Sequence, residues 1–429
     1  MAASSESATR AIGPLQLLAL GVNGIVGVGI FFAPAAVAAN APGLGAVAVF
    51  ALTGLCLLPA AVTFATLGRR FDEDGGPVVF ARAAFGDRVS FLVGWVAYVS
   101  ALFSTAAVVV GLTRATLPAL GLAGGPVAHA APALLATLLA VVVASGLRLS
   151  ARVWTSLTVL KLLPLLVLVG AFALAWGRFP LPAAPTPSLG WLRAALTVVF
   201  ACQGFEIVPV IAGQARSSSR AVPFATVGSL ALAIGLYAAL VLAAVAVLPA
   251  LASSAAPLAE AAGVLGGAAL ERLVAAGTSV SALGIAFGMM VTTPRYLSAL
   301  AAGERDLFAL DRVSSDGVPM RALAVSWLVV CAIVSLGDLG ELFALSGIAV
   351  LLQFGTSALA LAVLARRRAR GLSPRQAWPA LPTLAVAVGL VAWGATPREG
   401  LVAAAAVLAG IGLARLTRPR AEGERRAAR

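Results

Sequence analysis

The sequence predicts an all-α polytopic membrane protein from its composition, its apolar segments and its short connections. Of the 429 residues, 61% are hydrophobic and 11% are charged, and the mean hydropathy is +1.01. Soluble domains are less apolar and more charged, and disordered chains need the opposite balance, so both classes are excluded. The apolar bias extends over nearly the whole chain, and no connection is long enough to hold a soluble domain. We therefore expect one transmembrane transport domain over residues 1–429.

Twelve apolar segments carry this bias, and most of them reach the ~20 residues that a helix needs to cross the hydrocarbon core. An even number of crossings would place both termini on the same side of the membrane. The predicted segments are 14–39, 44–68, 88–113, 127–147, 153–176, 193–213, 223–251, 270–302, 320–337, 340–364, 378–395 and 399–417.

The arginines predict the orientation of these segments. Twenty-four arginines lie in the connections on the N-terminal side, and five lie in those on the other side. Positive residues favour the cytoplasmic side, so we expect both termini in the cytoplasm. The same distribution explains the net charge of +13 without a nucleic-acid partner, which would need a basic folded face.

Residues that could carry catalysis or bind metal are rare and scattered. Cys56, Cys202 and Cys331 lie inside apolar runs without paired spacing, and the one histidine, His129, has no second histidine nearby. A membrane enzyme would need clustered polar side chains facing a pocket. We therefore expect neither an enzyme nor a metal or cofactor site.

The first apolar segment contains signals that interrupt a helix. Gly21, Gly24, Gly27 and Gly29 precede Pro34 within it. Each interior glycine costs up to ~1 kcal/mol relative to alanine, and non-helical backbone in a membrane is tolerated only where protein or a cavity satisfies it. The alternative is a face of small residues against which another helix packs closely.

The sixth segment has a second interruption, because Gln203, Gly204, Glu206 and Pro209 fall in the middle of a crossing. Corresponding breaks in two halves of a chain indicate an inverted repeat with a transport site at the membrane midplane. Half-helix N-termini offer amide groups to a carboxylate, and half-helix C-termini offer carbonyls to an ammonium group. The arrangement suits a zwitterion.

Four sequence motifs in this order resemble a known family. They are Gly27-Val-Gly29-Ile-Phe31, the stretch from Gly75 to Gly86 with Phe91-Leu-Val-Gly-Trp95, the stretch from Phe200 to Glu206, and Arg220-Ala-Val-Pro223. The chain resembles the amino acid–polyamine–organocation (APC) superfamily, specifically the bacterial amino acid permeases, over nearly its full length.

The resemblance implies a five-plus-five inverted repeat with broken helices 1 and 6. Repeat 1 would cover about 14–176, repeat 2 about 193–364, and two extra helices about 378–417. It also implies a secondary active transporter in the plasma (bacterial inner) membrane. Such a permease would carry amino acids or related amines by alternating access.

The resemblance further implies which residues bind the substrate. Backbone groups in the first break would meet its carboxylate and amine, those in the second would complete the ammonium site, and the Phe200 ring is a candidate gate. Val28 departs from the family pattern, which often has a small hydroxylated residue there. The implied substrate-binding residues are Ile25, Gly27, Val28, Gly29, Phe200, Ala201, Gln203 and Gly204.

Two ionisable residues, Lys161 and Glu206, lie well inside predicted segments, where charge is costly and indicates function. In related permeases without bound sodium, a lysine in helix 5 takes the place of that ion, so we expect Lys161 to replace sodium and to couple transport to protons. Its alternative is a lysine that reaches the cytoplasmic interface. For Glu206, a gating or proton-sensing role stands beside a structural carboxylate that satisfies free backbone amides.

The leading function is thus a sodium-independent amino acid transporter, coupled to protons or working by exchange, embedded in a lipid bilayer. A neutral substrate is favoured, because no acidic residue besides Glu206 lies near the expected pocket. The alternatives are a sodium-coupled amino acid symporter and a membrane sensor that binds amino acids without transporting them.

Overall fold

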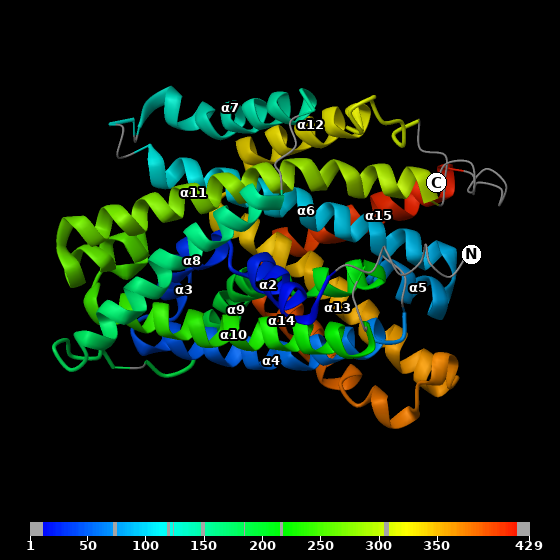
Figure 1. Cartoon of the computed structure of the whole chain (residues 1–429), viewed down its shortest axis with the longest axis horizontal. Coiled ribbons are helices and arrows are strands. Elements are labelled where there is room, and N and C mark those ends of the chain that lie inside the picture. The colour runs from blue at the N-terminus through cyan, green and yellow to red at the C-terminus, as the bar shows by residue number, and fades with distance from the viewer. Residues whose placement is uncertain are drawn as a thin grey trace.

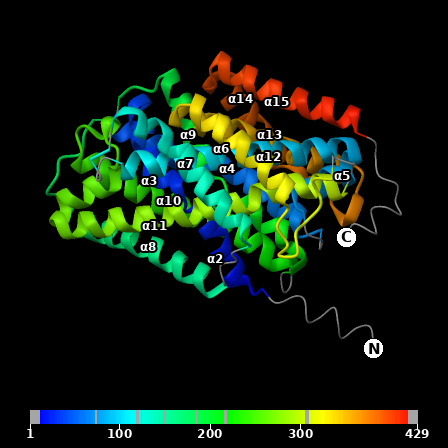
Figure 2. The ribbon, with the colours of Figure 1, turned by 90° about the horizontal axis from the view of Figure 1, so that it is seen from above.

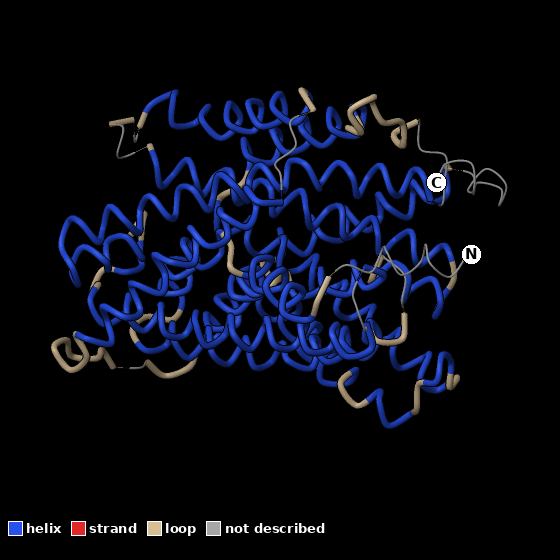
Figure 3. The backbone as a smooth tube through the Cα atoms, in the orientation of Figure 1, coloured by secondary structure: helices blue, strands red, loops and turns tan. Residues whose placement is uncertain are grey.

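The computed structural model describes residues 12–417 except 72–74, 118–120, 123, 147–150, 184, 215–217 and 304–308. Within these ranges the chain is helical and contains no β-strand, and most connections lie at the two ends of the helix bundle (Figure 3). The elements are α2 (Pro14–Ile25), α3 (Val28–Asn40), α4 (Leu44–Gly68), α5 (Pro77–Phe85), α6 (Asp87–Thr116), α7 (Gly125–Ala144), α8 (Ala151–Leu174), α9 (Leu189–Cys202), η2 (Phe205–Gln214), α10 (Ser218–Val247), η3 (Leu251–Ser253), α11 (Pro257–Gly303), α12 (Met320–Leu336), α13 (Leu339–Arg366), η4 (Ala369–Gly371), η5 (Pro374–Ala377), α14 (Ala380–Gly394) and α15 (Pro397–Leu416).

Eight of the described helices are long and apolar enough to cross a membrane. The α2–α3 pair forms a ninth span if the two helices are counted together, and they are bent by 42° at their junction. Three shorter apolar helices, Leu160–Leu174, Leu189–Cys202 and Met320–Ser335, occupy three further predicted segments. The all-helical polytopic class is therefore confirmed, whereas the count of twelve crossings stays a prediction.

The core lies around α6 and α10. α6 packs against α13 and α11, α10 packs against α4 and α2, and α3 packs against α9 (Figure 1). Seen from above, α14 and α15 lie along one edge of the bundle and α8 along the opposite edge (Figure 2). The last residues of α2 and α9, Ile25 and Cys202, and the first residue of α3, Val28, are buried in the interior of the bundle.

The hydropathy pattern did not predict two helical stretches. Residues 77–85, expected to be a connecting loop, form α5. The eighth predicted segment began at residue 270, but helical structure begins at Pro257, and Gly266 and Gly267 interrupt it with φ of −138° and 68°. These stretches are short and carry polar or small residues, so a search for long apolar runs passes over them.

Candidate functional site

The first break separates α2 from α3. α2 ends at Ile25 and α3 begins at Val28, while Val26 and Gly27 leave the helical conformation. Gly27 carries no side chain that could cap α3, so its N-terminus has no side-chain cap from this residue. The last carbonyls of α2 likewise lack a following helical turn. The break offers donors for an anion on one side and acceptors for a cation on the other.

Lys161 of α8 binds at this break. Its side chain is 4% exposed, and its Nζ donates to the carbonyl of Asn23 at 2.8 Å and to that of Val26 at 2.6 Å. Hydrogen bonds from a charged donor are stronger than neutral ones, and they offset part of the cost of burying the ammonium group. The lysine therefore lies over the end of α2, inside the protein.

The second break follows α9. α9 ends at Cys202, Gln203 is extended, and Gly204 has a φ of 125°, a conformation that favours glycine. The chain continues as the 3₁₀ helix η2. The Glu206 carboxylate accepts a hydrogen bond from the Gly204 amide at 2.7 Å. Glu206 thus satisfies a free backbone donor of its own break.

The two breaks lie in direct contact, and glycine makes this approach possible. A Cβ added to Gly204 would lie 2.5 Å from the carbonyl carbon and oxygen of Gly24. A Cβ added to Gly29 would lie 2.5 Å from the Cα of Ala201. Both distances are far below van der Waals contact, so the side-chain-free positions let the broken helices touch.

Tyr237 of α10 joins the breaks. Its hydroxyl is buried and lies within hydrogen-bonding distance of the carbonyls of Ile25, at 2.8 Å, and Ala201, at 3.2 Å. Tyr237 was not among the residues predicted from the sequence. The available signal was that Tyr237 is one of three tyrosines in the chain and falls in the middle of an apolar segment.

A polar cluster connects the second break to two neighbouring helices. The Gln203 amide donates to Ser104 Oγ of α6 at 3.0 Å, and Ser346 of α13 donates to Gln203 Oε1 at 3.3 Å. The two serine hydroxyls are 2.7 Å apart. We call Ser104, Gln203 and Ser346 the polar triad. Neither serine was selected from the sequence, because single serines in apolar runs are common.

Phe200 stacks on Phe343 of α13, with ring centroids 4.5 Å apart and an interplanar angle of 31°. Both rings are buried. Phe200 precedes Gln203 by three residues, and Phe343 precedes Ser346 by three, so the ring pair lies about one helical turn from the triad.

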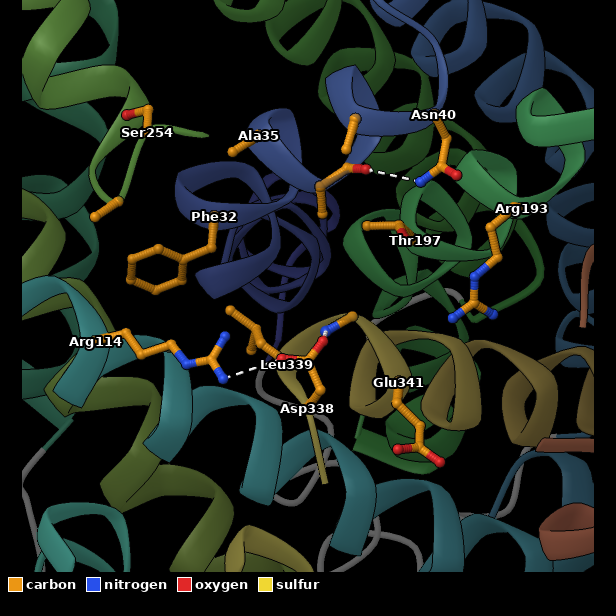
Figure 4. Close-up of a pocket in the computed structure, with 15 residues that line it drawn as sticks. Phe32, Ala35, Asn40, Arg114, Arg193, Thr197, Ser254, Asp338, Leu339 and Glu341 are labelled. Atoms are coloured by element: carbon orange, nitrogen blue, oxygen red, sulfur yellow. Dashed lines mark hydrogen bonds and ion pairs between the residues drawn. The ribbon is translucent and has the colours of Figure 1, made fainter. Parts of the chain in front are cut away.

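A cavity of about 540 Å³ lies beyond the ring pair, between α3, α6, α9 and α13 (Figure 4). Thr197 and Leu339 line it, and each lies about one turn before a member of the ring pair on its own helix. We call it the α3/α13 cavity. Along α9 and α13, the phenylalanine pair therefore falls between the residues that line this cavity and the polar triad.

Ion pairs surround the mouth of the α3/α13 cavity. Arg114 of α6 donates to Asp338 at 3.0 Å, as Figure 4 shows, and Arg193 of α9 pairs with the buried carboxylate of Glu399. Burial raises the pKa of Asp338, but hydrogen bonds from Arg114 and from the Gly340 amide outweigh it and hold this pKa below its usual value. The Asp338 carboxylate therefore stays charged at neutral pH.

The residues selected from the sequence thus gather at two touching breaks. Lys161 bonds to the first break and Glu206 to the second. Gln203 was expected to contribute its backbone, but its side chain also forms hydrogen bonds with Ser104 and Ser346.

A model of the amino acid permease family matches residues 12–408. The chain belongs to this family. It is 30% identical over 422 residues to an uncharacterized transporter of Mycobacterium tuberculosis (strain ATCC 25618 / H37Rv), covering 94% of this chain and 90% of the relative. It is also similar to two proteins of Bacillus subtilis (strain 168). The serine/threonine exchanger is 26% identical over 406 residues, covering 90% and 91% of the two chains, and the methylthioribose transporter is 24% identical over 386 residues, covering 85% and 83%.

Membership in the amino acid permease family confirms the resemblance found in the sequence. The relatives are transporters, so this family member is an integral membrane transporter of small molecules such as amino acids, and not an enzyme.

Proposed function

We propose that this permease moves amino acids or related amines across the plasma membrane by alternating access. One observation carries the proposal: two broken helices touch, no side chain caps the amides at the start of α3, and the carbonyls at the ends of α2 and α9 accept side-chain donors in place of a following helical turn. The amides suit a carboxylate and the carbonyls suit an ammonium group, so the pair of breaks is complementary to the part that all amino acids share.

In this proposal the predicted repeats, about 14–176 and about 193–364, rock against each other, with both termini in the cytoplasm. The stacked rings of Phe200 and Phe343 act as a gate between the α3/α13 cavity and the substrate site. The substrate contacts come from the backbone of Ile25, Gly27, Val28, Gly29, Phe200, Ala201, Gln203 and Gly204.

We further propose that transport needs no sodium, because Lys161 supplies the cation of the first break. Its ammonium group already lies on the carbonyls of Asn23 and Val26, where a bound metal cation would compete with it. Release of its proton would remove two charge-assisted hydrogen bonds from the end of α2. Lys161 therefore couples the shape of the break to proton movement.

Uptake by purified protein in sealed liposomes tests these statements. We expect radiolabelled amino acids to accumulate more with an acidic exterior than without a gradient, and equally in sodium and choline buffers. Uptake that requires sodium would favour the symporter alternative. Preloading with unlabelled amino acid distinguishes exchange, which it accelerates, from proton coupling alone.

The sensor alternative has a different outcome in the same assay. A sensor would bind an amino acid, detected as a rise in Tm, but would show neither uptake nor counterflow. Active counterflow would exclude it.

A further inference from the structure

The polar triad is a hydrogen-bonded ring of side chains within a largely apolar core. Ser104, Gln203 and Ser346 come from α6, the second break and α13, and their three mutual contacts measure 3.0, 3.3 and 2.7 Å. Ser104 is 3% exposed and Ser346 is fully buried, whereas Gln203 is only partly buried. The amide is thus the accessible member of the triad.

Helix packing alone does not account for these polar groups. The close approach of α9 and α13 is made by Gly347, where an added Cβ would lie 2.7 Å from the carbonyl oxygen of Leu196. Hydroxyl and amide groups buried in a membrane protein cost free energy unless they are paired, and apolar residues of similar size would avoid that cost. The triad members pair with one another and so avoid this cost, and Gln203, the member with exposed surface, can also contact a substrate.

The position of the triad indicates what it would bind. Gln203 directly follows Cys202, the last residue of α9, and Ala201 presents its carbonyl at the same helix end. An amino acid whose ammonium group binds the Ala201 carbonyl, alongside the Tyr237 hydroxyl, would have its side chain beside Gln203. The ring pair of Phe200 and Phe343 lies about one turn away and would limit the size of that side chain.

We propose that the polar triad binds the side chain of the substrate, and that the substrate is a small neutral amino acid with a hydroxyl or amide group. This inference rests on the proposed function. The Gln203 amide can both donate and accept, and the serine hydroxyls can do the same, so the triad matches hydroxyl and amide substrates such as serine, threonine and asparagine. It offers no opposite charge to a cationic or anionic side chain, which would be buried unpaired.

The selectivity expected from this arrangement is moderate. With an apolar substrate the triad keeps its internal hydrogen bonds, so no group is left unsatisfied. A hydroxyl substrate gains one or two neutral hydrogen bonds, which corresponds to about three- to tenfold per bond. We therefore expect kcat/KM to be about three- to tenfold higher, for each hydrogen bond gained, with L-serine than with L-alanine and with L-threonine than with L-valine.

Uptake of these four amino acids into liposomes tests the proposal. The wild-type protein should show the stated preferences, and Ser346→Ala should lower the serine-to-alanine ratio about three- to tenfold. Ser104→Ala changes a different helix and should lower the same ratio, so a folding defect in one variant does not decide the test. Ser357→Ala is the matched control, because Ser357 is also buried on α13 but forms no hydrogen bond with the triad, and its ratio should equal that of wild type.

Three results would overturn the triad proposal. They are a wild-type protein that takes up serine no better than alanine, variants that slow both substrates equally, and a Ser357→Ala control that shifts the ratio as much as Ser346→Ala. In each of these cases the proposed function in amino acid transport would remain valid. If the wild-type protein transports none of the four amino acids, binding decides: a larger rise in Tm with serine than with alanine supports the triad, and equal rises refute it.

Discussion

The two breaks differ in how their free backbone groups are satisfied. At the first break, carbonyls of Asn23, Val26 and Ile25 receive donors from distant helices, Lys161 of α8 and Tyr237 of α10. At the second break, Glu206 binds the Gly204 amide from only two residues away. Tyr237 also reaches the Ala201 carbonyl of the second break, so tertiary contacts hold both breaks, and the second break adds a side-chain bond from within its own segment.

This difference suggests a division of roles. A break that depends on a buried ammonium group responds to whatever changes that group, such as loss of a proton. The second break carries its own carboxylate, Glu206, so its shape depends less on the protonation of a distant group. The neighbouring side chain, Gln203, contacts Ser104 of α6. We associate coupling with the first break and selectivity with the second.

The largest expected effect is that of Gly204→Ala, which would push the breaks apart. The new Cβ would overlap the Gly24 carbonyl, and alanine is strained at a φ of 125°, so we expect a loss of about 2–5 kcal/mol and little or no uptake. Thermal unfolding in detergent and liposome uptake measure this. Gly235→Ala in α10, which has open space around its Cβ, should leave both unchanged. Wild-type uptake by Gly204→Ala would show that the contact is not needed.

Lys161→Ala should have the next largest effect and bears directly on the first break. The change removes the charged donor from the carbonyls of Asn23 and Val26, and a lost hydrogen bond to a charged group costs about 1.5–3 kcal/mol, so uptake should fall about tenfold or more and lose its pH dependence. The control is Leu163→Ala on the same helix, whose side chain is half-exposed. A Lys161→Ala protein that keeps the wild-type pH profile would contradict the coupling role.

Tyr237→Phe tests whether the two breaks act together. It removes one hydroxyl that serves carbonyls of both breaks, so we expect a cost of about 1–3 kcal/mol and a several-fold loss of uptake. Tyr98→Phe removes a hydroxyl that bonds Ser326, away from the breaks, and should affect stability more than transport. Equal losses of uptake in the two variants would indicate that Tyr237 has no special role.

Glu206→Gln separates the two interpretations of the second break. Glutamine keeps an acceptor for the Gly204 amide but cannot ionise, so the free energy of unfolding should change by less than about 1 kcal/mol. If uptake stays normal at every pH, Glu206 is a structural carboxylate and the gating role fails. A flattened pH profile would instead assign proton sensing to the second break.

Asp338→Asn should have the smallest effect. Asparagine is also a good N-cap, and exposed ion pairs contribute about 0–1 kcal/mol. Because Arg114 and the Gly340 amide lower the Asp338 pKa, its contribution is present above its unfolded pKa and is lost only as pH falls through the lower folded pKa. The pH profile of uptake between pH 5 and 8 should therefore be unchanged. A shifted profile would place part of the coupling at the α3/α13 cavity.

Much of the site could be located from the sequence, because the signals are local. Glycines at 24, 27 and 29 weaken the first helix where it breaks, and Gly204 marks the second break. The rarity of charge within apolar segments singled out Lys161 and Glu206. The partners could not be located in this way, since Tyr237, Ser104 and Ser346 are ordinary residues in their own segments.

The sequence by itself determined that this chain is a helical membrane transporter and where its helices weaken, because hydropathy and backbone preference act residue by residue. Only the tertiary structure decided which groups satisfy the breaks. Lys161 meets Asn23 across 138 residues, and Ser104 meets Ser346 across 242. Such pairs depend on which helix faces meet, and that is settled by packing among all the helices together, beyond what any single segment specifies.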